Sequence, residues 1–325
     1  MKVSIVGTGK IVEEVLKMLH AEFDGRITVT GILAREKSVE HAIDLCMEYA
    51  HDAFVFTDFS RMIDEAEADF VYIANANHVH FEYAMKAMKA GKNVIVEKPI
   101  AVDRVQTEQL IDTAIQKCVW CLPAYSLLYM PLYRQLTDMV RQLGTIRMVT
   151  ANYSQYSSRY DRYLQGTVTP VFSPEMAGGC LRDLNVYNLC FLIGLFGPPR
   201  TIHIASNYGY NGIDTSGALL MHYPTSVAIA SASKDSDGYN HACIQGELGY
   251  IEVKGSVSVM EEFTVHIRGK EPVTYTADKS RHRLSYEFEE FWKLIHDRDH
   301  CHIVVPYLTR IVQEISIALE RMKEI

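Results

Sequence analysis

The sequence has 325 residues, enough for two domains of ordinary size, each with its own hydrophobic core. Hydrophobic residues make up 48% of the chain and charged residues 22%, a balance that excludes a disordered or fibrous protein. The 32 basic and 40 acidic residues give a net charge of −8, and the chain contains no basic run. These features argue against nucleic-acid binding.

The same sequence carries no sign of a membrane segment. It opens with a short strand-like run rather than a signal peptide, and the uncharged stretch 119–133 contains two prolines and is too short to span a bilayer. Seven scattered cysteines indicate reduced thiols, and the "CVWC" stretch at 118–121 is interpreted as packing rather than a redox or zinc motif. We expect a cytoplasmic protein without a metal site.

The first part of the chain alternates strand and helix patterns. Short apolar or β-branched runs predict strands, and longer amphipathic runs follow them as helices. The predicted strands lie at the start of 2–19 and within 26–34, 54–59, 69–101 and 119–125. Such alternation predicts a parallel, doubly wound sheet with helices on both faces.

The pattern changes near Pro123. After a predicted helix at 130–144, longer alternating runs predict a large, mostly antiparallel sheet with a few helices. These runs are 145–158, 201–209, 217–234, 240–255 and 263–269. We therefore predict an α/β protein with a dinucleotide-binding domain at 1–122 and a second domain at 123–325. The amphipathic C-terminal helices are expected to pack on the body of the protein, where they can return to the first domain.

The segment Gly7-Thr8-Gly9 lies between the first predicted strand and the first predicted helix. Two glycines at this position allow a tight turn and a close approach of a pyrophosphate to the helix N-terminus. Val12 occupies the position of the third glycine of the usual fingerprint. The placement directly after the first strand favours a nucleotide site over a turn that needs glycine for steric reasons alone.

The end of the second strand bears on the choice between NADP and NAD. NAD-binding proteins usually place an acidic residue there for the ribose hydroxyls, whereas this chain has Ala34 followed by Arg35. Arg35 and Lys37 suit a 2′-phosphate, although Glu36 lies between them. We favour NADP and keep NAD, with Arg35 as a solvated loop charge, as the alternative.

Two further segments carry chemistry. Glu97-Lys98-Pro99 lies at the carboxyl end of a predicted parallel strand, where such sheets gather ligands. Pro99 disfavours a helical backbone at Lys98 and favours an extended one. The extended backbone would direct the lysine side chain into a cleft. In the stretch 176–188, a double glycine precedes Asp183 and Tyr187, which share a face if the stretch is α-helical.

Together these segments resemble the glucose–fructose oxidoreductase / inositol dehydrogenase / rhizopine-catabolism (Gfo/Idh/MocA) family. The resemblance covers nearly the whole chain and is carried by "VGTGKI" at 6–11, by residues 72–101 and by "GGCLRDLNVYNLCFLIGLFG" at 178–197. It implies a Rossmann domain joined to an α/β domain whose open sheet often forms dimers or tetramers. It also implies hydride transfer between NAD(P) and a secondary alcohol or carbonyl of a sugar, polyol or related substrate.

The resemblance also assigns residues. The lysine of the family's E-K-P motif falls on Lys98, the motif aspartate on Asp183, and the histidine of many members on Tyr187, as in the glucose–fructose oxidoreductase and dimeric dihydrodiol dehydrogenase branch. The chain departs from the family pattern at Ala177, Asn185, Pro123 and Leu128. Cofactor contacts are expected at Gly7, Thr8, Gly9, Lys10, Ile11, Arg35, Ala74, Asn75, Asn77, His80, Glu97 and Lys98.

These assignments suggest a mechanism. A phenol has an unperturbed pKa of ~10 and is a poor base near neutrality. A neighbouring ammonium group favours the phenolate and brings that pKa closer to the working pH. We therefore expect Tyr187 to act as general acid/base with Lys98 as its electrostatic partner. Asp183 is expected to bind a substrate hydroxyl or to position Lys98.

Two interpretations stay open at this stage. The first is an NAD(P)-dependent oxidoreductase, and the second is a non-catalytic NAD(P)-binding regulator or ligand sensor on the same fold. The presence of both Lys98 and Tyr187 favours the enzyme. A helical tyrosine beside Val186 and Leu189 is also compatible with simple core packing.

Overall fold

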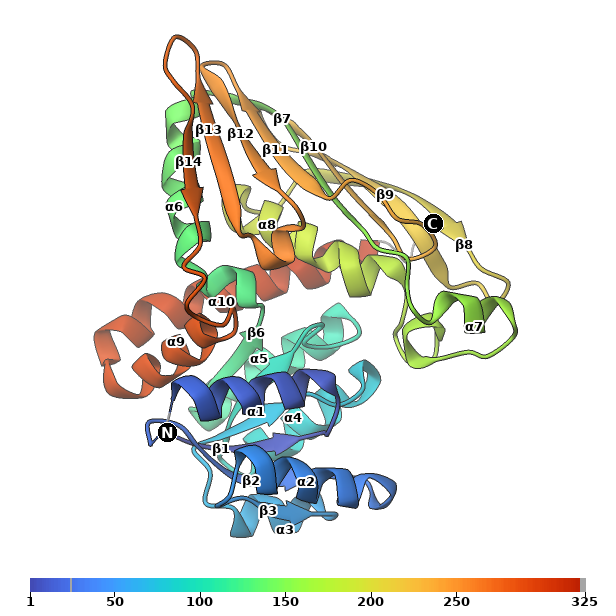
Figure 1. The fold of residues 1–325 in the computed structure, drawn as a ribbon, viewed down its shortest axis with the longest axis vertical. Coiled ribbons are helices and arrows are strands. Elements are labelled where there is room, and N and C mark those ends of the chain that lie inside the picture. Colours follow the sequence, from blue (N-terminus) through green and yellow to red (C-terminus); the bar gives the residue numbers. More distant parts are fainter. Residues whose placement is uncertain (24, 322–325) are drawn as a thin grey trace. The chain divides into compact units, whose positions relative to one another are not determined.

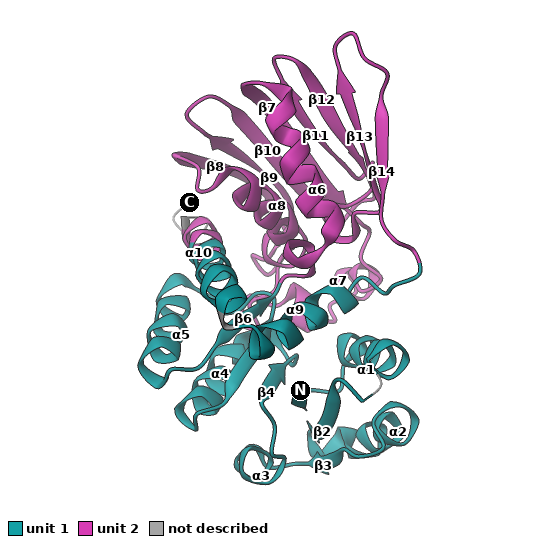
Figure 2. Ribbon diagram, turned by 90° about the vertical axis from the view of Figure 1, so that its left-hand side faces the viewer, with its two compact units in different colours: residues 1–124, 280–313 teal, residues 125–279, 314–325 magenta. Residues whose placement is uncertain are grey.

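The computed structural model describes residues 1–23 and 25–321, which form two compact units (Figure 2). Unit 1 contains residues 1–124 and 280–313, and unit 2 contains residues 125–279 and 314 onward. The sequence placed the boundary at 122/123 and allowed the C-terminal helices to return to the first domain. In the part of the chain that the structure describes, no helix is long and apolar enough to cross a membrane.

Unit 1 is built on a six-stranded parallel sheet with strand order β3-β2-β1-β4-β5-β6 (Figure 1). The order reverses between β1 and β4, so the carboxyl ends of these two strands form the topological switch point at which doubly wound sheets bind ligands. The strands are β1 (Lys2–Val6), β2 (Thr28–Leu33), β3 (Phe54–Phe56), β4 (Phe70–Ile73), β5 (Asn93–Glu97) and β6 (Cys121–Ala124).

The strands at the centre of this sheet are apolar along their length because helices cover both faces. All four residues of β4 are buried, as are four of the five residues of β1. The connecting helices are α1 (Lys10–Glu22), α2 (Val39–Tyr49), α3 (Phe59–Glu65), α4 (His80–Lys89) and α5 (Arg104–Lys117). This arrangement confirms the predicted doubly wound sheet.

A C-terminal segment completes unit 1. It contains α9 (Ser285–His296) and the first part of α10 (Arg298–Arg321), the helix that crosses into unit 2 after residue 313. Glu22 of α1 accepts hydrogen bonds from the His282 backbone at 2.7 Å and from the Ser285 hydroxyl at 2.6 Å. Arg283 forms an ion pair with Glu14 at 3.0 Å. These contacts fix α9 on the first helix of the Rossmann fold.

Unit 2 is built on an eight-stranded sheet with order β14-β13-β12-β11-β7-β10-β9-β8. Only the β7–β10 pair is parallel among the described strand pairs, which confirms the predicted mostly antiparallel sheet. The strands are β7 (Ile146–Ser154), β8 (Thr201–Tyr208), β9 (Asp214–His222), β10 (Val227–Ser233), β11 (His241–Gly246), β12 (Gly249–Lys254), β13 (Glu262–Ile267) and β14 (Val273–Thr276).

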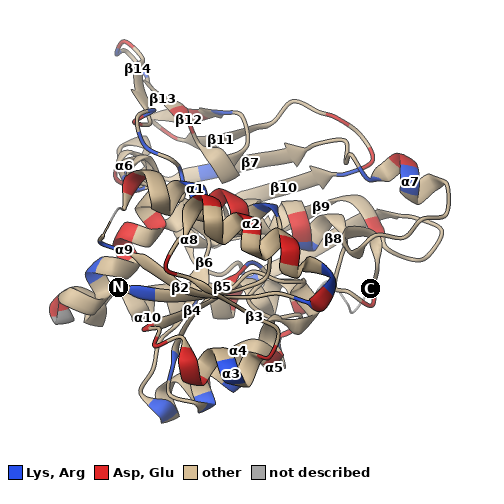
Figure 3. Ribbon diagram, turned by 60° about the horizontal axis from the view of Figure 1, so that its bottom comes forward, with Lys and Arg blue, Asp and Glu red and all other residues tan. Residues whose placement is uncertain are grey.

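Helices cover one face of this sheet. α6 (Pro131–Val140) and α8 (Val186–Phe196) lie against the same face in Figures 1 and 2, and α7 (Tyr160–Leu164) lies beyond the end of β7. Residues such as Ala228 and Ala230 of β10 point to the helices and are fully buried, whereas Ile229 between them is 37% exposed. This period-2 alternation is typical of a sheet with one uncovered face. Basic and acidic residues are interspersed along the helices of both units (Figure 3).

Candidate active site

The turn after β1 brings two strand ends unusually close together. Gly7 has φ +121°, and a Cβ atom at this position would lie 2.8 Å from the Ala74 carbonyl oxygen, just after β4. The Gly7 N–H donates to the Leu33 carbonyl oxygen at 3.0 Å. Only glycine fits between these backbones without strain. Glycine is therefore sterically required at residue 7, at the switch point of the sheet.

The N-terminus of α1 next to this turn suits an anionic group. Gly9 occupies the N-cap position, where no side chain caps the helix, and a Cβ there would meet nothing within 4 Å. The first-turn acid, Glu13, is paired with Lys17 at 2.6 Å, so its charge is offset. Unsatisfied N–H groups and the helix dipole both favour an anion here. The residues present thus fit the pyrophosphate of a dinucleotide.

A buried polar atom lies at the same edge of the sheet. Asn75 follows β4, and its Oδ1 atom is buried without a hydrogen-bond partner among the described residues. An acceptor left in this state is costly unless a ligand or water satisfies it. Asn77 starts a 3₁₀ turn, Asn77–Val79, that leads into α4.

Val12, at the third-glycine position, is fully buried in the core on α1.

The end of β2 leaves its charges open to solvent. Ala34 is buried, whereas Arg35, Glu36 and Lys37 are exposed at the start of a 3₁₀ turn, Glu36–Ser38. An exposed guanidinium group at this position can reach a ligand phosphate without breaking a buried contact.

His80 has a different part from the one expected. The sequence suggested a cofactor contact, but the imidazole is 1% exposed and both of its nitrogens face backbone carbonyls. Nδ1 lies 2.9 Å from the Pro99 oxygen and Nε2 lies 3.1 Å from the Asn75 oxygen. Burial lowers the pKa of His80, and the two carbonyls oppose that effect. His80 therefore joins the loop after β4 to the loop that carries Lys98.

Glu97, expected among the cofactor contacts, takes part in a buried carboxyl cluster. Its Oε1 accepts a 2.6 Å hydrogen bond from the Tyr72 hydroxyl, and its Oε2 accepts from the Lys98 N–H at 3.2 Å. Glu287 of α9 is 2% exposed. Burial raises the pKa of Glu97, while burial and the charge of Glu97 raise the pKa of Glu287 well above its ordinary value. Glu97 thereby anchors the end of β5, from which Lys98 follows.

The double glycine of unit 2 is required by two close approaches. A Cβ on Gly178 would lie 2.6 Å from the Pro170 carbonyl oxygen, and Gly179, with φ +107°, would place a Cβ 2.0 Å from Oδ1 of Asp214. The other oxygen of Asp214 accepts the Leu181 N–H at 2.6 Å. The carboxylate from β9 thus satisfies a free N–H at the start of the following helix. Ala177 adopts φ +54°, a conformation that glycine would adopt without strain.

The stretch after the glycines is not a regular α-helix. Leu181–Asn185 forms a π-helical turn before α8 begins at Val186. A π turn contains an extra residue, so the backbone between Asp183 and Tyr187 is wider than the regular α-helix that the sequence suggested; such turns are frequent at functional sites. Asn185, which replaces the family's glycine, donates to the Ala230 carbonyl oxygen at 3.1 Å and accepts from Asn188 at 2.8 Å. These bonds fix the π turn to β10.

Asp183 and Tyr187 have partly accessible side chains, as does Arg182 in the same segment. Tyr187 is half-buried between the buried residues Val186 and Asn188, and its ring centroid lies 6.0 Å from that of Tyr153. The Asp183 carboxylate accepts a 2.5 Å charge-assisted hydrogen bond from Lys234. Sequence reasoning missed Lys234 because an isolated lysine after an alternating strand is usually solvated.

Comparison with known proteins identifies the family of this chain. Residues 1–125 match the model of an oxidoreductase family with an NAD-binding Rossmann fold, and residues 133–252 match the GFO/IDH/MocA C-terminal domain. The chain belongs to the Gfo/Idh/MocA family. It is an NAD(P)-binding oxidoreductase of that family, as the resemblance implied.

Three members show the range of the family around this chain. The scyllo-inositol 2-dehydrogenase (NADP(+)) IolU of Bacillus subtilis is 32% identical over 91% of this chain and 88% of its own. A trans-1,2-dihydrobenzene-1,2-diol dehydrogenase of Xenopus tropicalis is 22% identical over 66% of this chain and 64% of its own. The 3-ketoreductase KijD10 of Actinomadura kijaniata, solved with NADP and TDP-benzene, has the same fold, with a TM-score of 0.82, 18% identity and coverage of 98% and 96%.

The raised pKa of Glu287 predicts how stability depends on pH. An acid whose folded pKa exceeds its unfolded value of about 4.3 binds its proton more tightly in the folded state. Its stabilising contribution is therefore complete below the unfolded pKa and is lost as the pH rises through the folded pKa. We expect Glu287→Gln to raise the thermal midpoint above that of the wild type at pH 8 and to leave it unchanged near pH 4, as measured by calorimetry.

Glu289→Gln on the same helix is the control, with the opposite sign. Burial acts to raise the pKa of Glu289, but the hydrogen bond from Arg281 lowers it, and the pKa lies below its ordinary value. This substitution should cost stability at neutral pH and cost little in acid. A Glu287→Gln midpoint below the wild type at pH 8 would contradict the buried-carboxyl interpretation.

Proposed function

We propose that this protein transfers a hydride between NADP and a secondary alcohol or carbonyl of a neutral, hydroxyl-rich substrate such as a sugar, a polyol or a dihydrodiol. Tyr187 is the general acid/base, Lys98 is its electrostatic partner, and Asp183 accepts a hydrogen bond from a substrate hydroxyl. The observation that carries the proposal is the partly accessible phenol of Tyr187 at the end of a π turn that hydrogen bonds and two sterically required glycines fix in place.

The proton chemistry follows from the residue types. NADPH, when bound, supplies the hydride, so the protein has to supply a proton to the carbonyl oxygen. The Tyr187 hydroxyl donates that proton in reduction and becomes a phenolate, and the phenolate accepts the proton in oxidation. A nearby ammonium group stabilises the phenolate form, which lowers the barrier in both directions. General acid–base help of this kind contributes roughly 10²–10⁴-fold.

The substrate class is supported by the charges of unit 2. A carboxylate oriented by a hydrogen bond from Lys234 suits a hydroxyl donor of the substrate. Relatives with substantial coverage are named for scyllo-inositol and for a dihydrobenzene diol, which are both neutral molecules with vicinal hydroxyls.

Removal of the Tyr187 hydroxyl tests the mechanism. We expect Tyr187→Phe to lower kcat at least about 100-fold, because the proton donor is lost, and to leave NADPH binding near normal. Stopped-flow measurement of NADPH oxidation with ketoses and inosose-type ketones, and of NADP reduction with diols, gives kcat. Fluorescence titration gives the affinity for NADPH. Tyr208→Phe, at a β8 tyrosine that is 62% exposed, is the matched control. Turnover close to wild type in the Tyr187 variant would remove the assignment.

The cofactor preference is supported by Arg35 and Lys37 at the end of β2 and by the NADP-dependent relatives. We expect Arg35→Ala to weaken NADPH binding roughly 10- to 100-fold, the range of one charge-assisted contact, without weakening NADH binding. Parallel fluorescence titrations measure both. Arg61→Ala, which removes an exposed ion pair with Glu65 on α3, is the control. Equal losses for NADH and NADPH would contradict a 2′-phosphate contact.

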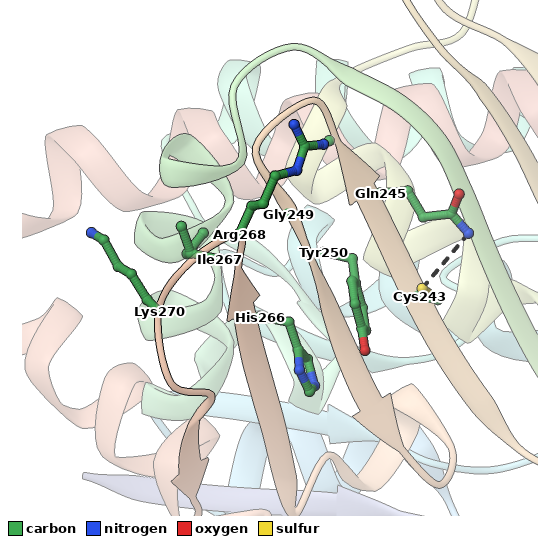
Figure 4. A pocket seen from close by; sticks show the side chains of 9 residues that line it. Cys243, Gln245, Gly249, Tyr250, His266, Ile267, Arg268 and Lys270 are labelled. Atoms are coloured by element: carbon green, nitrogen blue, oxygen red, sulfur yellow. Dashed lines mark hydrogen bonds between the residues drawn. The ribbon is translucent and has the colours of Figure 1, made fainter.

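We further propose that the uncovered face of the unit 2 sheet forms a homo-oligomer interface. Met148, Leu220, Ile229 and Tyr250 come from four strands and are each 37–41% exposed on the face opposite the helices. At the edge of this face, Tyr250 stacks on His266 with a centroid distance of 4.3 Å beside an open groove (Figure 4). An apolar patch spanning several strands is typical of a subunit interface.

Light scattering with size exclusion tests this interface. We expect the wild type to run as a dimer or tetramer and Ile229→Lys to shift it toward the monomer, because the substitution places a charge at the centre of the patch. Ile303→Lys, at an α10 residue that is 73% exposed, should leave the mass unchanged. A monomeric wild type, or an Ile229→Lys variant of unchanged mass, would contradict the proposal.

A further inference from the structure

The buried ammonium group of Lys234 lies next to the Asp183 carboxylate of unit 2. Lys234 directly follows β10, and its backbone is held on both sides. Its N–H donates to the Thr215 carbonyl oxygen on β9 at 2.9 Å, and its carbonyl oxygen accepts the Ser157 N–H at 2.9 Å. The origin of the side chain is thus fixed to two neighbouring segments.

The side chain itself is enclosed. It is 3% exposed, its Nζ lies 5.0 Å from the Phe172 ring centroid, and the same atom lies 2.5 Å from Oδ2 of Asp183. The Asp183 side chain is 27% exposed. The pair is therefore asymmetric: the cation is sealed in the protein, and a ligand reaches the pair through the carboxylate.

This asymmetry makes the pair persistent. A buried ammonium that loses its counter-ion is strongly destabilising, so the Asp183 carboxylate is held against the Lys234 ammonium. Lys234 supplies the external restraint, while the Asn185 bond to β10 fixes the backbone of the turn.

We propose that Lys234 is a positioning residue that holds Asp183 as a pre-oriented anion for the substrate hydroxyl next to the reacting carbon. The proposal rests on the proposed function, in which Asp183 touches the substrate. Lys234 itself does not touch the substrate and acts only through Asp183.

A double-mutant cycle on activity tests this role. We expect Lys234→Met and Asp183→Asn each to lower kcat/KM by about 10- to 100-fold, the range expected when a substrate-orienting group is misplaced. The double variant should be no slower than Asp183→Asn, because Lys234 has no second route to the substrate. NADPH affinity should stay at the wild-type value. Lys254→Met, which breaks an exposed ion pair with Glu262 in the same unit, is the matched control.

A second cycle on thermal midpoints distinguishes positioning from simple folding defects. Asp183→Ala removes the hydrogen-bonded counter-ion of a buried ammonium, leaving it only the Phe172 ring and the charge of Asp214, and should lower the midpoint by at least about 5 °C. Lys234→Met leaves only a partly exposed carboxylate and should cost less. The double variant Asp183→Ala/Lys234→Met should recover part of the loss. A Lys234→Met variant that largely keeps its thermal midpoint but has a lower kcat/KM then shows that Lys234 acts on catalysis rather than on folding.

Failure of the proposed function and failure of the role proposed for Lys234 give different results. A wild-type protein that binds NADPH but oxidises it with no substrate of the panel contradicts the proposed function. A wild type that turns over, together with a Lys234→Met variant of wild-type kcat and KM, overturns the role of Lys234 alone. Losses that multiply in the double variant also overturn it, because they show that Lys234 acts by a route other than Asp183.

Discussion

The carboxylate of Asp214 determines where the segment that carries Asp183 and Tyr187 begins. It approaches so closely that residue 179 has to be glycine, and it satisfies the N–H of Leu181. A side chain at 179 would push the carboxylate away, leave that N–H without its acceptor and release the start of the π turn. This contact between a strand and a glycine therefore sets the start of the segment, while Asn185 and Lys234 restrain the residues that follow.

The two units treat their buried charges in opposite ways. In unit 1, burial raises the pKa values of Glu97 and Glu287, and Glu97 accepts hydrogen bonds from the Tyr72 hydroxyl and the Lys98 N–H. In unit 2, the Asp183 carboxylate accepts a hydrogen bond from a buried lysine. The first arrangement anchors a strand end, and the second orients a partly accessible carboxylate.

Much of this protein was predictable from the order of its residues. The continuous apolar runs gave the parallel sheet, the alternating runs gave the antiparallel one, and Gly7, Gly9 and Asn75 proved to lie at one edge of the first sheet. The π turn could not be predicted, because its extra residue depends on Asn185 reaching Ala230, which is 45 residues away in the chain. Lys234 was missed for the same reason: its burial depends on Phe172 and Asp183, which are distant in sequence. The burial of His80 was also not predictable, because it depends on backbone carbonyls of two separate loops.

The path of the chain has a consequence for fragments of this protein. Because unit 1 contains residues 280–313 as well as 1–124, a truncation after residue 124 removes part of that compact unit. Such a fragment loses α9 and leaves Glu14 and Glu22 of α1 without Arg283 and Ser285. It also uncovers the apolar surface against which Phe288 packs beside Tyr72. A minimal version of the Rossmann unit therefore has to join the C-terminal helices to residue 124 through a short artificial linker.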